Sequence, residues 1–522
     1  MKKSILILGT VLITVGVWAQ PYLSLFSVND ESTLKTVYDN TVPVCSCEDL
    51  LKLSIPDTKI ESAVFRATDS TCMVTAIVNH PPSNDRVTVY LTLPVNTWNG
   101  RFYGMGGGGF MAGIPLLLGL PASQGFAAGV TDAGHAGGSG SFALDTESGR
   151  LRWQEIRDFA YQGIHDMTVV GKAVVEAYYG KPARYSYFVG GSTGGRQAMM
   201  EAQRFPEDYD GIMSYFPAIN WSRLLMADLW PQAVMNDEGN YVSAAKLEAV
   251  TAAVIRASDG DDGVIDGVID YPLNCRWDPG EFVGTTVGDE VFTEADANVI
   301  RRIWEGPRTC DGKFMWYGST RGTSLGDLAG TKGSPLTGAP FDISLEWIRY
   351  FLVLNPAWDI NSLTWAEFEQ LFNQSVDQYT DVIGTENTDL SHFRDHGGKL
   401  IIMHGLADQL VPPQGTIRYF DRMSGRMGGI QATSYFARLY LVPGVDHSLS
   451  GAGPTPVGQL DALIQWVEQG KAPYRIVAEL KDKEGKLIRT RPLFPYPSIA
   501  VYSGEGNPDN ADNFNPQLQT RK

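Results

Sequence analysis

The fold is decided by the stretch YSYFVGGSTGGRQAMM, residues 185–200. Its apolar beginning, Tyr185–Val189, predicts a buried β-strand, and the residues from Gly195 to Arg204 predict a helix. Between them lies Gly190-Gly191-Ser192-Thr193-Gly194, which has the form G-x-S-x-G. A sharp turn from strand to helix needs glycines beside the serine, because the serine takes a strained backbone angle and neighbouring backbone approaches closely. This context predicts a nucleophilic Ser192, and the alternative is an ordinary serine in a glycine-rich turn.

Strands and helices alternate on both sides of this turn. Further strands are predicted at residues 86–93, 101–105, 125–131, 210–215, 399–404 and 438–442, and further helices at 156–179 and 459–469. The alternation implies an α/β fold with a mostly parallel sheet covered on both faces. It is lost between residues 220 and 391, which are rich in Trp, Gly and Asp. We therefore expect a first core part with an N-terminal extension at 20–219, a lid domain at 220–391 and a second core part with a C-terminal tail at 392–522.

Length, composition and charge exclude several classes of function. The chain has 522 residues, of which 43% are hydrophobic and 19% charged, so it can bury a full core and is not a disordered protein. Its net charge is −17. A surface this acidic repels phosphate backbones and anionic lipid, so no nucleic-acid partner is expected.

The N-terminus has the layout of a secretory signal peptide. Lys2 and Lys3 precede the apolar run Ile5–Val17, and Val17-Trp18-Ala19 places small residues at the usual cleavage positions. We expect removal of residues 1–19, a secreted or periplasmic protein of bacterial type, and no membrane association after cleavage. An uncut membrane anchor is the alternative, but the run is shorter than the ~20 residues that a membrane span needs.

A serine nucleophile needs a base, and an α/β-hydrolase places it late in the chain, in the order serine, acid, histidine. His447 fits, because it follows the predicted strand 438–442 after a Pro-Gly turn. His404 ends a strand itself, so a structural role near the site is expected for it. The other histidines are less suitable because they precede Ser192 or lie in a polar loop before a core strand: His80, His135, His165, His392 and His396.

Two aspartates compete for the role of the acid. Asp408 comes just after the predicted strand 399–404, which precedes the histidine's strand. Asp446 is adjacent to His447, and such close neighbours rarely reach the far nitrogen of the imidazole. We therefore predict the triad Ser192, Asp408 and His447, with an acyl-enzyme intermediate.

The oxyanion of such a reaction needs two backbone donors. One is expected to be the N–H of Thr193, and the other to come from Gly106–Gly109, with Gly108 or Gly109 as the donor. Residues 104–109 also have the form G-x-G-x-x-G. A dinucleotide fingerprint should open a helix, whereas the residues after Gly109 resemble a loop, so no organic cofactor is expected.

An acidic segment lies inside the predicted lid. It reads Asp259-Gly-Asp-Asp262-Gly-Val-Ile-Asp266-Gly-Val-Ile-Asp270, and its hard oxygen ligands and Gly turns suit Ca²⁺. The spacing is not that of an EF-hand, because Gly263 falls at a ligand position and no Glu closes the loop. The alternative is a solvated acidic turn.

With these residues, the sequence resembles the tannase/feruloyl esterase family, which includes tannases, feruloyl and chlorogenate esterases and mono(2-hydroxyethyl) terephthalate hydrolases. The resemblance covers nearly the whole chain after the signal peptide. The matching residues are Gly106–Phe110, Tyr187–Gly190 with Ser192–Gln197, Tyr209–Ile212 with Pro217-Ala218, His404-Gly405 with Asp408 and Pro412-Pro413, Gly444 with His447, and Arg491–Leu493 with Pro495–Pro497.

The resemblance implies an α/β-hydrolase core with a large inserted lid that holds a structural Ca²⁺ ion. Carried over to this sequence, the calcium ligands are the side chains of Asp259, Asp262 and Asp266 and the carbonyl oxygens of Val264 and Val268. The chain has five cysteines, none in a C-x-x-C and none with histidines at zinc spacing. Sequence proximity and the resemblance favour the bridges Cys47–Cys72 and Cys275–Cys310, with one cysteine left over.

The sequence departs from the family at two disulfides. Family members usually have Cys immediately before the nucleophile and immediately after the catalytic His, joined in a bridge; here these positions are Gly191 and Ser448. A second pair near the C-terminus is also absent, with Phe494 and Asn515 in its place. We expect the triad to rely on packing to hold its geometry.

The family implies a small-molecule substrate, an ester of an aromatic acid such as a feruloyl, galloyl, chlorogenate or terephthalate monoester. Trp347–Phe351 and Trp365–Phe372 are candidate stacking surfaces, or else belong to the core of the lid. Two other functions are carried as alternatives. One is a serine hydrolase of another type, such as a peptidase, and the other is a non-catalytic, calcium-stabilised binding protein.

Overall fold

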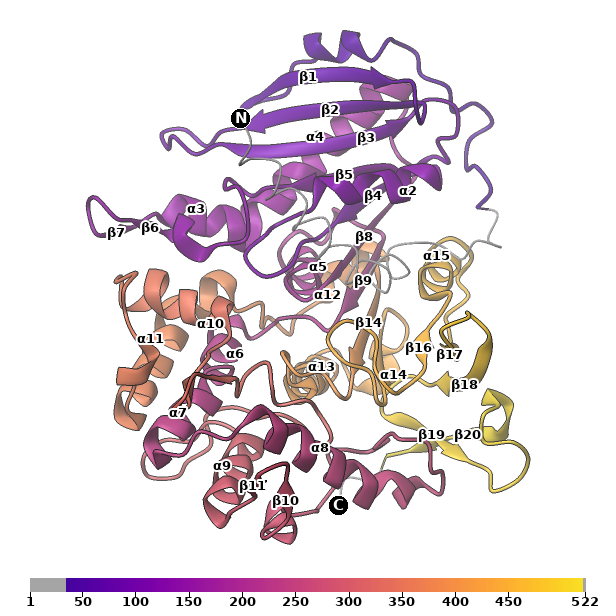
Figure 1. The fold of residues 1–522 in the computed structure, drawn as a ribbon. Coiled ribbons are helices and arrows are strands. Elements are labelled where there is room, and N and C mark those ends of the chain that lie inside the picture. The colour runs from indigo at the N-terminus through magenta and orange to yellow at the C-terminus, as the bar shows by residue number, and fades with distance from the viewer. Residues whose placement is uncertain (1–33, 520–522) are drawn as a thin grey trace.

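The computed structural model describes residues 34–519 (Figure 1). The predicted signal peptide, residues 1–19, lies outside the described residues. Within the described range, every helix is too short or too polar to cross a membrane.

A nine-stranded sheet organises the described chain, in the order β1-β2-β3-β5-β4-β8-β9-β14-β15. The six strands from β5 to β15 run parallel, and β1 to β3 continue the sheet as an antiparallel edge. The strands are β1 Thr58–Arg66, β2 Thr71–Val78, β3 Val87–Pro94, β4 Arg101–Met105, β5 Ala127–Thr131, β8 Tyr185–Gly191, β9 Gly211–Tyr215, β14 Lys399–Gly405 and β15 Ala437–Val442. This mostly parallel sheet confirms the predicted fold class.

Helices cover both faces of the sheet because its central strands are apolar on both faces. Phe188 and Ile402 belong to a buried cluster with helices α4 (Gly163–Tyr179), α5 (Thr193–Arg204) and α13 (Pro413–Arg426). Their neighbours Val189 and Met403 point to the opposite face and pack with α15 (Gln459–Gln469). Successive side chains of a strand alternate between faces, so two cores form from one sheet.

The chain between β9 and β14 forms a separate, mainly helical layer with its own core, drawn from magenta to orange in the lower part of Figure 1. Its helices are α6 Trp221–Ala227, α7 Trp230–Glu238, α8 Ala244–Ser258, α9 Glu294–Glu305, α10 Asp342–Trp347 and α11 Trp365–Ile383, with the short hairpins β10 Thr286–Val287 with β11 Glu290–Val291 and β12 Thr331–Lys332 with β13 Thr337–Gly338. Phe110 and Phe159, which precede β8, pack into this cluster, and Phe110 stacks on Phe351 of the lid, so the lid and the core share a buried aromatic contact.

The aromatic lid segments belong to the core of the lid. Trp347, Phe351, Phe368 and Phe372 are all buried, and the Trp347 indole donates a hydrogen bond to Ser375 Oγ. Trp365 is half-buried and lies under the Arg302 guanidinium. These side chains hold the lid together, as the alternative interpretation of the sequence proposed.

Several elements were not predicted from the sequence. β1 and β2 are missing from the predicted strands, and the predicted helix 156–179 is divided into α3 (Trp153–Arg157), a π-helical turn (Asp158–Gln162) and α4. The C-terminal tail is two small sheets, β16 Thr455–Pro456, β17 Ile476–Lys481 and β18 Leu487–Leu493, then β19 Ser498–Tyr502 and β20 Phe514–Leu518. The remaining short elements are α2 Gly119–Ser123, β6 Leu144–Asp145, β7 Arg150–Leu151, α12 Ser391–His396 and α14 Ile430–Thr433.

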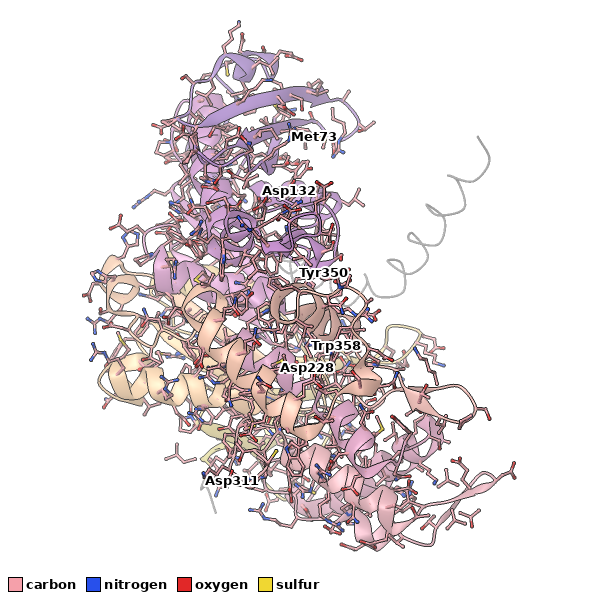
Figure 2. All side chains as sticks on the ribbon, turned by 90° about the vertical axis from the view of Figure 1, so that its left-hand side faces the viewer. Met73, Asp132, Asp228, Asp311, Tyr350 and Trp358 are labelled. Atoms are coloured by element: carbon pink, nitrogen blue, oxygen red, sulfur yellow. A yellow bond between two sulfur atoms is a disulfide. The ribbon has the colours of Figure 1, made fainter. Side chains whose placement is uncertain are left out.

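The structure contains the disulfide Cys47–Cys72, which ties the segment before β1 to β2. The predicted bridge Cys275–Cys310 is wrong, because both residues are free thiols. Cys275 is buried with its Sγ 3.2 Å from Ser258 Oγ, whereas Cys310 is exposed in a loop next to Asp311, which Figure 2 labels near the bottom of the molecule. Proximity in sequence was a poor guide here because the lid fold separates the two residues.

Candidate active site

Ser192 occupies the turn between β8 and α5 in a strained backbone conformation, with φ 59° and ψ −121°. A non-glycine residue seldom adopts a positive φ, and at this turn the strain presents the side chain at the end of the strand. The flanking glycines are needed for space. A Cβ atom on Gly190 would lie 2.4 Å from the backbone of Gly194, and one on Gly106 would lie 2.5 Å from the Cα of Gly194.

His447 lies between the serine and an aspartate. Its Nε2 is 3.0 Å from Ser192 Oγ, and its Nδ1 is 2.9 Å and 3.0 Å from the two carboxylate oxygens of Asp408. The backbone N–H of His447 donates to Gln409 Oε1, which fixes the start of its loop. Strands β8, β14 and β15 end at the same edge of the sheet, and the structure therefore brings the three predicted residues together.

Asp408 is almost completely buried, and burial alone opposes its ionisation. The neighbouring imidazoles of His447 and His404 outweigh that effect and hold the pKa of Asp408 well below its usual range. Its Oδ1 also accepts hydrogen bonds from the N–H groups of Leu410 and Val411. An ionised carboxylate is thereby available to orient the imidazole of His447.

His404 has a structural place beside the acid, as expected. It is fully buried, and its Nε2 lies 3.2 Å from Asp408 Oδ2 and 2.9 Å from the Val411 carbonyl oxygen. Its Nδ1 contacts Thr416 Oγ1. His404 therefore links the aspartate to helix α13 instead of facing the serine.

Asp446 takes a different role from Asp408. Its carboxylate accepts hydrogen bonds from the N–H groups of Ser448 and Ser450 and from both of their hydroxyls. It therefore organises the loop that carries His447 and is turned away from the imidazole nitrogens that contact Asp408 and Ser192.

The two candidate glycines of the early loop differ in what their N–H groups do. Gly108 N–H donates to the Met111 carbonyl oxygen at 3.0 Å, so this donor is already engaged. Gly109 has a positive φ of 58°, its carbonyl accepts from Thr193 Oγ1, and its N–H has no acceptor within the described residues. Thr193 is the first residue of α5, where backbone N–H groups lack partners inside the helix. Thr193 and Gly109 are therefore the two residues whose backbone N–H groups remain available to bind an oxyanion.

Phe216 was not predicted, yet it contacts both ends of the site. It follows β9, and its ring centroid lies 4.6 Å from that of His447. A Cβ atom on Gly191 would come within 2.7 Å of the same ring. The sequence signal that could have found Phe216 is its position directly after the strand next to the one that carries the nucleophile.

A second buried carboxyl, Asp228, lies in the lid, and Figure 2 labels it at mid-height. Burial raises its pKa well above the usual range, and the charge of Asp408 adds to that effect. Its Oδ2 is 3.3 Å from Ser344 Oγ. Burial therefore disfavours the ionised form of Asp228, whose side chain contacts Ser344 in the lid.

The acidic loop of the lid is folded into a compact turn. Asp259 accepts hydrogen bonds from the N–H groups of Asp266 and Gly267, and Asp266 Oδ2 pairs with Arg491 at 2.6 Å. Burial and the proximity of other carboxyl groups raise the pKa of both Asp262 and Asp270. Neighbouring carboxyl oxygens are the kind of donor that suits a hard cation.

The α/β-hydrolase class is defined by a mostly parallel sheet with a strained serine at a strand-to-helix turn. The aspartate and the histidine follow the last two strands, as they do here. Comparison with known proteins identifies the family within that class. The sequence model of the family described as "Tannase and feruloyl esterase" matches residues 72–516. The chain belongs to this family.

Relatives in sequence agree with this assignment. The chain is 41% identical to a probable feruloyl esterase of Arthroderma benhamiae, over 85% of each chain. It is 31% identical to the mono(2-hydroxyethyl) terephthalate hydrolase of Piscinibacter sakaiensis, over 80% of this chain and 79% of the other. The protein is accordingly a carboxylic ester hydrolase.

Solved structures agree on the fold. Feruloyl esterase B from Aspergillus oryzae superimposes with a TM-score of 0.80 at 24% identity, covering 90% of this chain and 99% of the other. The tannin acyl hydrolase from Aspergillus niger gives a TM-score of 0.77 at 23% identity, over 89% and 92% of the two chains.

Proposed function

We propose that this protein hydrolyses small-molecule esters of aromatic carboxylic acids through Ser192, His447 and Asp408. The observation that carries the proposal is the position of the His447 ring, with one nitrogen 3.0 Å from Ser192 Oγ and the other 2.9 Å from Asp408. The aromatic acyl group is inferred from the relatives, which are named for feruloyl and terephthalate esters.

The geometry supports a two-stage reaction. Ser192 Oγ attacks the ester carbonyl while His447 Nε2 takes its proton, and Asp408 stabilises the imidazolium and holds its tautomer. The carbonyl oxygen becomes an oxyanion, which receives hydrogen bonds from the N–H groups of Thr193 and Gly109. His447 then gives the proton to the leaving alcohol. Water hydrolyses the acyl-enzyme by the same proton transfers in the second stage.

The test uses the purified protein and Ser192→Ala on methyl ferulate, methyl gallate, chlorogenate and a terephthalate monoester. We expect the wild type to cleave at least one of them and Ser192→Ala to lose almost all of that activity. Inactivity of the wild type on all four would refute the aromatic ester assignment. Turnover that survives in Ser192→Ala would refute the mechanism.

We also propose a structural Ca²⁺ ion in the acidic loop, held by the side chains of Asp259, Asp262 and Asp266 and the carbonyls of Val264 and Val268, with Asp270 as a further donor. The neighbouring carboxyl groups of Asp262 and Asp270 support this assignment, because a bound cation would offset the burial that raises the pKa of both groups. The ion would stabilise the loop after α8 and take no part in the reaction. An unchanged melting temperature after strong chelation would argue against it, and we expect a decrease that added Ca²⁺ reverses.

Export to the periplasm or the medium is proposed on the N-terminal pattern of residues 1–19. The expected mature N-terminus is Gln20. Mass spectrometry of the protein recovered outside the cytoplasm tests this, and an intact Met1 or recovery with the membrane would contradict it.

A further inference from the structure

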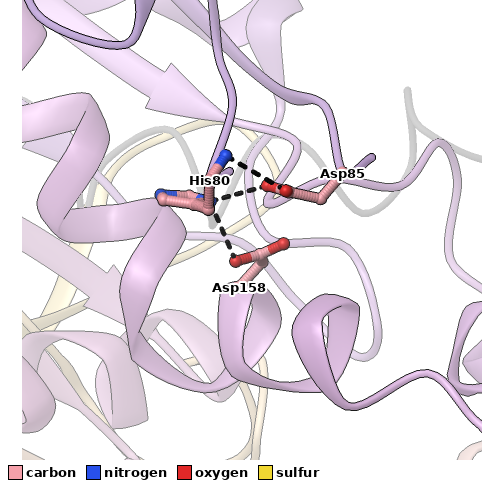
Figure 3. Close-up of side chains that lie close together, drawn as sticks. All are labelled: His80, Asp85 and Asp158. Atoms are coloured by element: carbon pink, nitrogen blue, oxygen red, sulfur yellow. Dashed lines mark hydrogen bonds and ion pairs between the residues drawn. The ribbon is translucent and has the colours of Figure 1, made fainter. Parts of the chain in front are cut away.

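A second polar cluster lies away from the candidate active site, where the turn between β2 and β3 meets the π-helical turn before α4. It consists of His80, Asp85 and Asp158, and Figure 3 shows the two carboxylates converging on the imidazole. His80 Nδ1 is 2.6 Å from Asp85 Oδ2 and 3.6 Å from Asp158 Oδ1. One ligand atom from each residue lies within 4.8 Å of the other two, a grouping seen nowhere else in residues 34–519.

The cluster places buried carboxyl groups around one imidazole without a Lys or Arg of the described chain as countercharge. Asp158 is 0% and Asp85 5% exposed, and in the described structure neither forms an ion pair with a Lys or Arg. A third carboxylate, Asp166 on α4, lies 3.1 Å from His80 Nε2. Among residues 34–519, His80, when it is protonated, is the one cationic group within 4.0 Å of all three carboxylates. Buried carboxylates are expensive without countercharge or coordination.

Buried polar atoms of this cluster lack hydrogen-bond partners in the described part of the chain. Asp158 Oδ2 is fully buried and has no hydrogen-bond partner within the described residues, while its Oδ1 accepts from Gln154 Nε2 at 2.8 Å. Asp166 Oδ2 and His80 Nε2 face each other at 3.1 Å, and neither has a further partner within the described residues. Native structures rarely leave such atoms unpaired, and a bound ion is one of the ordinary reasons for an exception.

We propose that His80, Asp85 and Asp158 bind a divalent transition-metal ion of the Zn²⁺ type. One imidazole nitrogen with two carboxylates suits such an ion better than Ca²⁺, which takes oxygen ligands. The ion replaces the proton between His80 Nδ1 and Asp85, and Asp166 then faces the outer nitrogen of the ring. A carboxylate behind a metal-bound histidine is the usual arrangement that fixes the ring orientation.

Arg196 connects the proposed metal site to the nucleophile, through hydrogen bonds to backbone carbonyl groups. Asp158 begins the π-helical turn, and the carbonyl oxygens of the next two residues, Phe159 and Ala160, accept hydrogen bonds from the buried guanidinium of Arg196. Arg196 lies on α5, and its N–H donates to the Ser192 carbonyl. A bound ion at Asp158 therefore stabilises the turn that holds α5, and its role is structural.

The test measures Zn²⁺ binding to untagged, chelator-treated protein by calorimetry. The parent protein carries Cys310→Ser, because an exposed thiol also binds zinc. Excess Ca²⁺ is present to saturate the acidic loop of the lid. We expect one equivalent of Zn²⁺ to bind and the melting temperature to rise. Asp158→Asn should weaken binding by about 100-fold or more, since it removes a ligand at nearly constant volume.

Asp208→Asn is the matched control, because Asp208 forms a similar pair with His165, at 2.7 Å, outside the cluster. It should leave Zn²⁺ binding unchanged. Absence of binding in the parent protein, or equal binding in the parent and Asp158→Asn, would overturn the proposal. If Asp158→Asn does not fold, X-ray absorption of the Zn²⁺-loaded parent protein identifies the atoms that bind the ion. One nitrogen ligand together with oxygen ligands would support the site. Several nitrogen ligands, or oxygen ligands alone, would refute it.

Discussion

The ring of Phe216 packs against the imidazole of His447, with centroids 4.6 Å apart, and also closes the space beside Gly191. It therefore contacts both the residue before the nucleophile and the base. The resemblance to the family leads us to expect a disulfide between positions 191 and 448, where this chain has Gly and Ser. We expect the packing of Phe216 to hold Gly191 and His447 in place without that covalent link.

This relationship predicts strong coupling between Gly191 and Phe216. Gly191→Ala should lower kcat by about tenfold, because its methyl group pushes the ring towards His447. Phe216→Ala should also lower kcat and should destabilise the protein by about 3–5 kcal/mol through loss of a buried aromatic ring. The double variant should show no further loss from Gly191→Ala, and a double-mutant cycle on kcat and on the free energy of unfolding measures this.

The control for that cycle is Phe393→Ala, which removes a fully buried ring in the cluster around α13. It should reduce stability by a similar amount and leave kcat nearly unchanged at a temperature where the protein is folded. Additive effects of Gly191→Ala and Phe216→Ala would show that the ring does not couple the two ends of the site.

The two neighbouring aspartates should respond differently to the same change. Asp408→Asn should lower kcat by about 10⁴-fold, because the amide favours the wrong imidazole tautomer. Asp446→Asn makes the same change in a carboxylate whose hydrogen bonds go to its own loop. The kcat of this variant should therefore fall by no more than about tenfold. Comparable losses in the two variants would mean that the acid has been assigned to the wrong residue.

The pH dependence of stability should carry the signature of Asp408. Its pKa in the folded protein is lowered, so the unfolded chain, with a pKa near 3.9, takes up the proton first as the pH falls. The stabilising contribution is complete above about pH 5 and is lost as the pH falls below about 4 towards the folded pKa. Urea unfolding of the wild type between pH 2 and 6 should therefore show a steeper decline than that of Asp408→Asn, and parallel curves would contradict this.

Much of this site could be predicted from sequence because its residues follow buried strands. The apolar runs of β8, β14 and β15 locate Ser192, Asp408 and His447 at one edge of the sheet. Phe216 could not be predicted, since its contact with His447 depends on how β9 lies beside β8. β1 was missed because its apolar residues do not alternate, since a bulge lies between Ile60 and Ser62 and both Val64 and Phe65 are exposed. The Cys275–Cys310 pairing failed because it depended on the fold of the lid.

Thiol chemistry should reflect the corrected pairing. The native protein should have one disulfide, Cys47–Cys72, and three free cysteines, of which the exposed Cys310 reacts first with a thiol reagent. Cys275 should react only after unfolding, since it is buried in the lid. Peptide mapping without reduction checks this, and a peptide that joins Cys275 to Cys310 would contradict it.

The central claim is that Ser192 forms an acyl-enzyme with an aromatic acid, and rapid quenching with intact and peptide mass spectrometry tests it most directly. During turnover of an activated feruloyl ester, or of the aromatic ester that the protein cleaves fastest, the account predicts one acyl group per chain, attached to the peptide that contains Ser192. His447→Ala should prevent its formation. An acyl group on another residue, or rapid turnover with no acylated protein in the wild type under conditions where deacylation limits the rate, would contradict the account.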